Sequence, residues 1–171
     1  TMVEVVNNST RYMSDTDINA MSVYLSALPA TEDQGQFIYD ATEAQRLVNL
    51  DFSSPGAQIY YEYCSNCHVT GGNGYYPYQP ALAGNPGVLD PDSSTLINMT
   101  LNGSLRIVSS AGPATTDMPY FRQLLNDRQI ADVLSYIRSS WGNEASAVSP
   151  EQVARVRAGT DPTQNDDIFV L

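Results

Sequence analysis

Lysine is absent from this chain of 171 residues, and histidine occurs only once, as His68. All eight basic residues are arginines, and 19 acidic residues bring the formal net charge to −11. Nucleic acid is therefore not an expected partner, because phosphates call for a basic protein surface. The acidic surface is typical of a secreted protein that must stay soluble.

Long hydrophobic runs are missing too. A membrane-spanning helix needs about 20 consecutive apolar residues, and no stretch comes close, so no transmembrane segment is expected in this chain. The first residues also lack the basic and apolar regions of a secretory signal. We expect either that a leader has been removed or that the chain is a fragment.

Cysteine occurs only as Cys64 and Cys67, with His68 directly after them. This Cys-x-x-Cys-His pattern is the attachment signature of a covalent c-type haem. Positions i and i+3 of a helical turn share one face, so both thiols can reach one porphyrin edge while His68 reaches the iron. A structural zinc site needs about four such ligands, and a thioredoxin-like motif would expect a βαβ setting. The motif therefore predicts one covalent haem c and a periplasmic or other extracytoplasmic location.

The sixth iron ligand must come from elsewhere, and without a second histidine a methionine is the natural candidate. Met118 precedes Pro119, which favours an extended segment over a helix, and it lies between a flexible loop and the closing helix. Met99 shares a helical pattern with apolar neighbours, where core packing is the better explanation. We therefore predict axial ligation by His68 and Met118.

Three more residues are candidates for a role at the haem. An iron-bound histidine usually donates its second ring N–H to a backbone carbonyl, and Pro80 is well suited to lie under His68. Arg106 and Trp141 are candidates for the haem propionates, as is Arg138. For the last two, a core ring at Trp141 and a solvated helix position at Arg138 are the better explanations. No nucleophile–base pair can be formed with the histidine committed, so we expect no catalytic activity.

Hydrophobic periodicity predicts an all-α fold with an N-terminal helical extension. Residues 1–29 hold a helix capped by Ser14 or Asp15, residues 30–53 form a connector with a short helix over 42–50, and residues 143–171 form a C-terminal extension. The haem unit spans residues 54–142 and opens with Ser54 as cap and Pro55 at the first helical position. Further helices are predicted over 94–102 and from 126 to the Trp-Gly pair at 141–142.

The N-terminal helix is similar in sequence to the last helix of the haem unit. Its Ser-Asp-x-x-Ile and Tyr-Leu elements match Asn-Asp-x-x-Ile and Tyr-Ile at a constant offset of 112 residues. The N-terminal region is therefore interpreted as the end of a second haem domain whose own attachment motif lies upstream. Without that domain, the helix must pack on the haem unit, pair with another copy or meet a partner subunit. An uncovered apolar face is typical of an interaction site, so residues 1–30 are expected to mediate association, including self-association.

These motifs together resemble a class I cytochrome c domain. Leu82-Ala83-Gly84-Asn85-Pro86, and Ser139-Ser140-Trp141-Gly142-Asn143 followed by Ala147-Val148-Ser149, resemble the third haem domain of a triple-haem cytochrome subunit. That subunit belongs to bacterial membrane-bound dehydrogenases that act on alcohols, gluconate, sorbitol or aldehydes. Two complete haem motifs of the subunit are missing here.

The resemblance implies electron transfer from a dehydrogenase catalytic subunit toward quinone or another terminal acceptor. Two alternatives remain open from the sequence. One is a free periplasmic cytochrome that donates to an oxidase or reductase. The other is a haem enzyme or gas sensor, which would need an open position on the iron.

Overall fold

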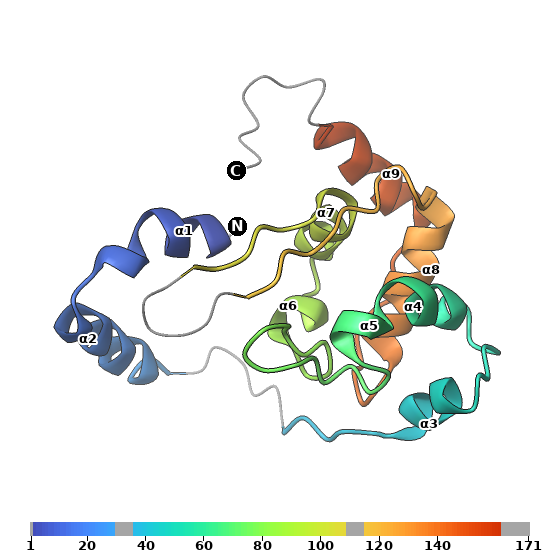
Figure 1. Cartoon of the computed structure of the whole chain (residues 1–171), viewed down its shortest axis with the longest axis horizontal. Helices are drawn as coiled ribbons and strands as arrows, with labels where there is room; N and C mark the ends of the chain where they lie inside the picture. Colours follow the sequence, from blue (N-terminus) through green and yellow to red (C-terminus); the bar gives the residue numbers. More distant parts are fainter. Residues whose placement is uncertain (1, 30–35, 109–114, 162–171) are drawn as a thin grey trace.

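Helices make up the regular secondary structure of the described chain (Figure 1). The computed structural model describes residues 2–29, 36–108 and 115–161. Parts of the predicted connector, of the loop before Met118 and of the C-terminal extension, together with the side chain of Met2, lie outside them. The described residues contain no strand, only two isolated β-bridges, so the predicted all-α fold is confirmed. The elements are α1 (Met2–Asn8), the 3-10 helix η1 (Thr10–Tyr12), α2 (Asp15–Ser26), α3 (Thr42–Val48), α4 (Ala57–Tyr63), α5 (Ser65–His68), α6 (Pro86–Leu89), α7 (Ser94–Asn102), α8 (Asp127–Ser139) and α9 (Pro150–Gly159).

The N-terminal helix α2 forms where its cap predicted. The Ser14 side chain accepts a hydrogen bond of 3.2 Å from the backbone N–H of Asp17, which satisfies one free donor of the first turn. None of the residues of α2 is buried. Its apolar stripe is open to solvent, with Ile18 at 46% and Leu25 at 59% exposure.

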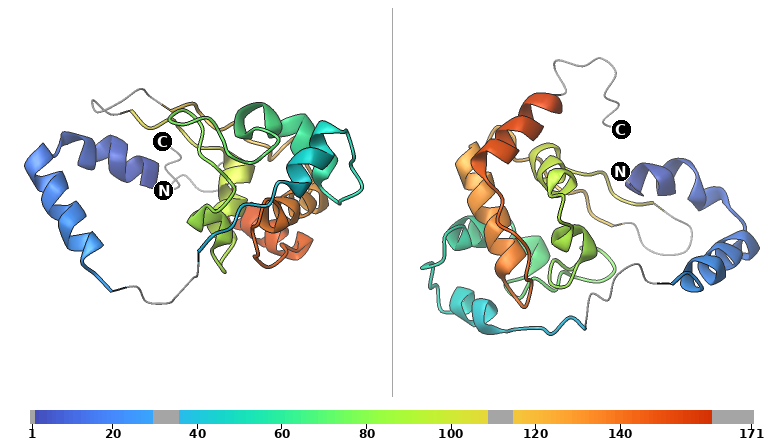
Figure 2. Two further views of the ribbon diagram at one scale, coloured as in Figure 1. Left: turned by 90° about the horizontal axis from the view of Figure 1, so that it is seen from below. Right: turned by 180° about the vertical axis from the view of Figure 1, so that it is seen from behind.

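Helices α1 and α2 lie to one side of the cluster formed by α3 to α9 (Figures 1 and 2). Asn7 at the end of α1 links this arm to the cluster. Its Nδ2 donates to the Arg106 carbonyl at 3.0 Å, and its Oδ1 accepts from the Val108 N–H at 2.9 Å. The amide group thus pairs with the extended segment that runs from α7 toward α1.

Helix α8 is the centre of the core. Asn126 and Gln129 form a capping box at its start, an arrangement that satisfies two free backbone N–H groups. It packs on α4 and α9, and α9 packs in turn on α7. Its buried residues are Ile130, Ala131, Val133, Leu134, Tyr136, Ile137 and Arg138.

The helix that carries the cysteines begins later than predicted. Ser54 and Pro55 lie in a turn, and Gly56 is the N-cap with a φ of +82°. A Cβ atom on Gly56 would lie 2.2 Å from the carbonyl oxygen of Asp132 in α8. The predicted Ser54 cap is therefore wrong, because glycine is needed where α4 approaches the backbone of α8.

The packed unit is longer than the predicted 54–142. Helix α8 ends at Ser139, and the chain turns back through Trp141, whose φ is +59°. Beyond it, Val148 and Val153 are buried, because α9 covers α7 and α8. On the N-terminal side of the predicted unit, Leu47 of α3 is 1% exposed, and the Asp40 N–H donates to the Trp141 carbonyl at 3.1 Å. Residues on both sides of the predicted boundaries thus belong to the same core.

Candidate haem site

Cys64, Cys67 and His68 form a single helical turn at the junction of α4 and α5. The backbone N–H groups of Cys67 and His68 both donate to the Cys64 carbonyl, at 3.2 and 2.9 Å. The two sulfurs and the imidazole therefore share one side of the turn, as the spacing predicted. Cys64 is half-buried against the core and Cys67 is exposed.

The two cysteines are not joined to each other by a disulfide. Burial raises the pKa of the Cys64 thiol to about 12, and the neighbouring Cys67 adds to the effect. Before haem attachment, Cys64 is therefore a neutral thiol at pH 7. Each sulfur is available to form a thioether with a vinyl group.

The imidazole of His68 is held by the backbone of the following loop. Its Nδ1 lies 3.0 Å from the carbonyl oxygen of Pro80, and since a carbonyl can only accept, Nδ1 carries the proton. Burial lowers the pKa of His68, and the hydrogen bond to Pro80 opposes that shift. The ring is therefore neutral, with Nε2 left as the nitrogen for a metal. Pro80 lies where the sequence analysis placed it.

Gly74 lets the loop fold under His68. A Cβ atom on Gly74 would lie 2.5 Å from the carbonyl oxygen of Pro80, so only glycine permits this approach. The Gly74 N–H donates to the His68 carbonyl at 3.1 Å, and the Leu82 N–H donates to the Gly72 carbonyl at 2.7 Å. The Pro80 carbonyl is thereby fixed opposite the imidazole.

Val69, directly after His68, is held in an unfavourable conformation. Val69 has a φ of +64°, which for a β-branched residue costs about 1–3 kcal/mol. Tyr60 donates its hydroxyl to the Val69 carbonyl at 2.6 Å, and Trp141 donates its indole N–H to the Thr70 carbonyl at 3.0 Å. These buried rings force the chain to turn sharply away from the helix at this point.

Trp141 thus acts on the protein backbone. It is 1% exposed, and its ring lies 5.0 Å from that of Tyr60 and 5.8 Å from that of Tyr136, measured between centroids. Because its only donor is used on Thr70, the geometry leaves the indole no N–H for a haem propionate. The core-ring explanation of the sequence analysis fits this geometry.

The two candidate arginines differ. Arg106 is exposed and belongs to an extended segment, where its backbone N–H donates to Asp117 Oδ1 at 2.7 Å. Arg138 is 1% exposed, so its expected solvated position is wrong. Its guanidinium instead donates to three backbone carbonyls, those of Val88, Asp90 and Ser146.

Met118 lies in an extended segment, as the following proline predicted. It pairs with Ser104 in an antiparallel bridge, with hydrogen bonds of 2.8 Å from the Met118 N–H and 3.1 Å to its carbonyl. Its side chain is partly buried against the same core cluster that Cys64 contacts. Met99 on α7 is only half-buried, which differs from the predicted core position.

These side chains fit a haem c. Two thiols on one turn suit a pair of thioethers, and a neutral imidazole and a thioether are both established haem ligands. Among the described residues, no group of three or more His, Cys, Asp and Glu side chains could hold a metal ion. The donors therefore suit a haem better than a bare metal ion.

Asn143 is a supporting residue that the motif analysis missed. Its Oδ1 accepts from the Gly84 N–H at 2.8 Å, and its Nδ2 donates to the carbonyls of Leu82 and Ile137 at 3.2 and 2.8 Å. It ties the loop after Pro80 to the end of α8. The available signal was its place in the Trp-Gly-Asn run that carried the family resemblance.

Comparison with known proteins assigns the chain. The family model for cytochrome c matches residues 53–141, close to the predicted haem unit. The chain belongs to the cytochrome c family. The family match and the helical structure together identify the cytochrome c fold. Members of this family carry a covalently bound c-type haem and transfer electrons. Within the described residues, no helix is long and apolar enough to cross a membrane.

The similar proteins are cytochrome subunits of dehydrogenases. The chain is 37% identical over 159 residues to the cytochrome c subunit of alcohol dehydrogenase (quinone) from Gluconacetobacter polyoxogenes, covering 91% of this chain and 34% of that protein. It is 38% identical to the gluconate 2-dehydrogenase cytochrome c subunit of Pantoea cypripedii, covering 91% and 36%. The fructose dehydrogenase cytochrome subunit of Gluconobacter japonicus is 31% identical, at 92% and 36%. The chain thus spans about a third of the length of these relatives.

Proposed function

We propose that this chain carries one haem c, bound covalently through Cys64 and Cys67 and ligated by His68 and Met118. The observation that carries the proposal is the hydrogen bond of 3.0 Å between His68 Nδ1 and the Pro80 carbonyl. This hydrogen bond fixes the tautomer and leaves Nε2 on the side of the ring away from the loop. An iron-bound histidine usually makes such a bond with its second ring nitrogen.

The protein's own groups then set the properties of the site. A haem bound here supplies reversible one-electron chemistry. A methionine thioether, compared with a second histidine, favours the reduced state and raises the reduction potential. The buried rings of Tyr60 and Trp141 hold the backbone after His68, so the imidazole has little freedom to move between redox states.

We propose that the chain acts as an electron-transfer part of a dehydrogenase complex outside the cytoplasm. The catalytic subunit would donate electrons, and quinone or another terminal acceptor would receive them. The support is the similarity to cytochrome subunits of alcohol, gluconate and fructose dehydrogenases over more than nine-tenths of this chain. The alternative of an open-iron enzyme or sensor is tested by the ligation experiment below.

The number of haems is tested by intact mass under denaturing conditions. The chain plus one haem, resistant to extraction by acid and organic solvent, is the expected result. Cys64→Ala and Cys67→Ala should each leave a single thioether, and the double variant should lose the haem on extraction. A wild-type chain of apo mass contradicts the proposal.

The ligation is tested with two methionine variants. Met118→Ala should open one iron position, so that the reduced protein binds carbon monoxide, while the wild type should resist it. Met99→Ala is the matched control and should keep the wild-type spectrum. If the wild type already binds carbon monoxide readily, the open-iron alternative replaces this proposal.

We also propose that α2 is the closing helix of a preceding cytochrome domain. Ile18 and Leu25 of α2 correspond to Ile130 and Ile137 of α8, which are 0% and 5% exposed. The same stripe that is covered in α8 is thus open in α2. In the isolated chain, the exposed apolar face of α2 should bind a second copy, so that residues 1–30 mediate self-association. Sedimentation of the full chain and of a version lacking residues 1–30, which keeps α3 and its buried Leu47, tests this, and equal monomeric behaviour contradicts it.

A further inference from the structure

The segment that carries Met118 is joined to the C-terminus of α7 by backbone hydrogen bonds. Besides the bridge between Met118 and Ser104, the Phe121 N–H donates to the Thr100 carbonyl at 3.1 Å, and the Arg122 N–H donates to the Leu101 carbonyl at 3.0 Å. These bonds occupy carbonyls that a helix end leaves without partners. The position of Met118 therefore depends on how firmly the following residues stay on α7.

Arg122 fastens the segment to two helices at once. Its Nε donates to Asn102 Oδ1 at 2.8 Å, at the end of α7. Its two terminal nitrogens donate to the carbonyls of Arg157 and Thr160 at 2.9 and 3.0 Å, at the end of α9. The planar fork of a guanidinium suits such divergent acceptors, whereas a lysine offers a single point of contact.

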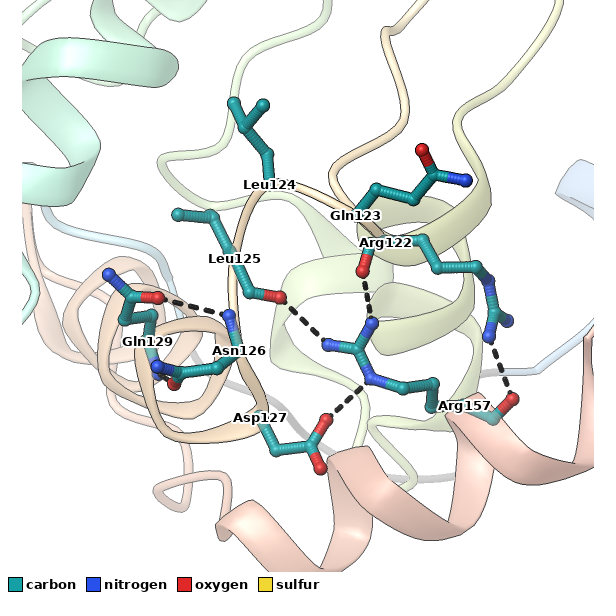
Figure 3. A pocket seen from close by; sticks show the side chains of 8 residues that line it. All are labelled: Arg122, Gln123, Leu124, Leu125, Asn126, Asp127, Gln129 and Arg157. Carbon is teal, nitrogen blue, oxygen red and sulfur yellow. Dashed lines mark hydrogen bonds and ion pairs between the residues drawn. The ribbon is translucent and has the colours of Figure 1, made fainter.

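Arg157 in turn donates hydrogen bonds to the segment that contains Arg122 (Figure 3). Its guanidinium donates to the backbone carbonyl of Arg122 and, at 2.9 Å, to that of Leu125. Its Nε also forms an ion pair of 2.6 Å with Asp127, where α8 begins. Each arginine side chain thus binds the backbone carbonyl of the other, and the pair joins α7, α8 and α9 around residues 121–125.

We propose that Arg122 and Arg157 are positioning residues that hold the Met118 segment on α7 and thereby keep the Met118 sulfur on the iron. The inference rests on the ligation proposed above. It gives a role to α9, which lies beyond the residues 53–141 that the cytochrome c family model matches. Neither arginine needs to touch the haem for this role.

The test uses the full-length holoprotein and measures how readily imidazole replaces the methionine in the oxidised state. Arg157→Gln should bind imidazole about tenfold more tightly than the wild type, which corresponds to about 1.4 kcal/mol of lost methionine binding. Its far-red methionine–iron band should weaken accordingly. Arg155→Gln, on the exposed face of the same helix, removes the same charge and should keep the wild-type affinity.

A second control separates positioning from general stability. Val153 on α9 is fully buried, so Val153→Ala should lower the unfolding midpoint while leaving the imidazole affinity unchanged. The inference is overturned if Arg157→Gln matches Arg155→Gln, or if Val153→Ala raises the affinity as much as Arg157→Gln does. If Arg157→Gln gives no holoprotein, Thr160→Val replaces it. It removes the Thr160 hydroxyl, which accepts from Arg122 at 2.9 Å, with an expected increase of about threefold, and no increase overturns the inference.

Failure of the ligation proposal looks different. In that case Met118→Ala would bind imidazole and carbon monoxide no better than the wild type, whatever the arginine variants show. If Met118→Ala opens the iron but Arg157→Gln behaves like the wild type, ligation stands and only the positioning role is lost.

Discussion

Gly103 separates α7 from the extended segment opposite Met118, and its replacement should disturb both. Its φ of +75° and ψ of −172° lie in a region that is essentially restricted to glycine, and another residue there costs about 1–3 kcal/mol. An added Cβ would also lie 2.5 Å from the Met118 carbonyl oxygen and 3.2 Å from the Tyr120 nitrogen. Such overlap in a packed site typically adds about 1–3 kcal/mol. Gly103→Ala should therefore lower the free energy of unfolding by about 2–6 kcal/mol.

The assay is guanidinium unfolding of the holoprotein, followed both by helical circular dichroism and by the methionine–iron band. Because the overlap falls on the Met118 backbone, the band should disappear at lower denaturant than the helical signal. Gly159→Ala is the matched control: its Cβ would meet nothing within 4 Å at the end of α9, and it should stabilise by up to about 1 kcal/mol. The reasoning is refuted if Gly103→Ala changes the free energy of unfolding by less than about 0.5 kcal/mol.

Two further predictions concern buried and exposed charge. Arg138→Met should cost at least about 1–3 kcal/mol, since the buried carbonyl of Val88 loses its donor, as do the partly buried carbonyls of Asp90 and Ser146; a neutral result in denaturant unfolding contradicts this. Hydrogen bonds from Thr42 and Ser94 lower the pKa values of Asp40 and Asp92 below 3.8. Since the folded state then binds fewer protons, their stabilisation is complete above that pH and is lost as the pH falls through the folded pKa values. Asp40→Asn/Asp92→Asn should flatten the acid side of the stability profile, and parallel profiles would count against it.

Local rules predicted much of this chain. The helix over 94–102 has the observed bounds of α7, because its apolar spacing and the following glycine both mark them. The Cys-x-x-Cys-His turn and the Pro80 contact likewise depend on residues within one loop of each other. Covalent and helical geometry decide such features over short distances, so the sequence pattern is sufficient.

The misses arise from contacts between distant backbones. Gly56 marks where α4 meets α8, and the arginine pair joins chain segments 35 residues apart. Arg138 reads as a solvated position on an amphipathic helix, yet it is 1% exposed because loop carbonyls converge on it. Hydrophobic periodicity and residue spacing do not predict such contacts, because every position offers a backbone carbonyl and the sequence does not mark which of them a distant side chain will reach.

The two sides of the proposed iron site are supported unequally. His68 is fixed by the Pro80 carbonyl, while Tyr60 and Trp141 hold the carbonyls of the next two residues, of which Val69 has an unfavourable positive φ. Those contacts come from buried rings at the centre of the core. Met118 instead depends on an isolated bridge and on side-chain hydrogen bonds near the surface, where water competes for the same acceptors. Mild denaturant, heat or a competing ligand should therefore release Met118 while His68 and the thioethers stay in place.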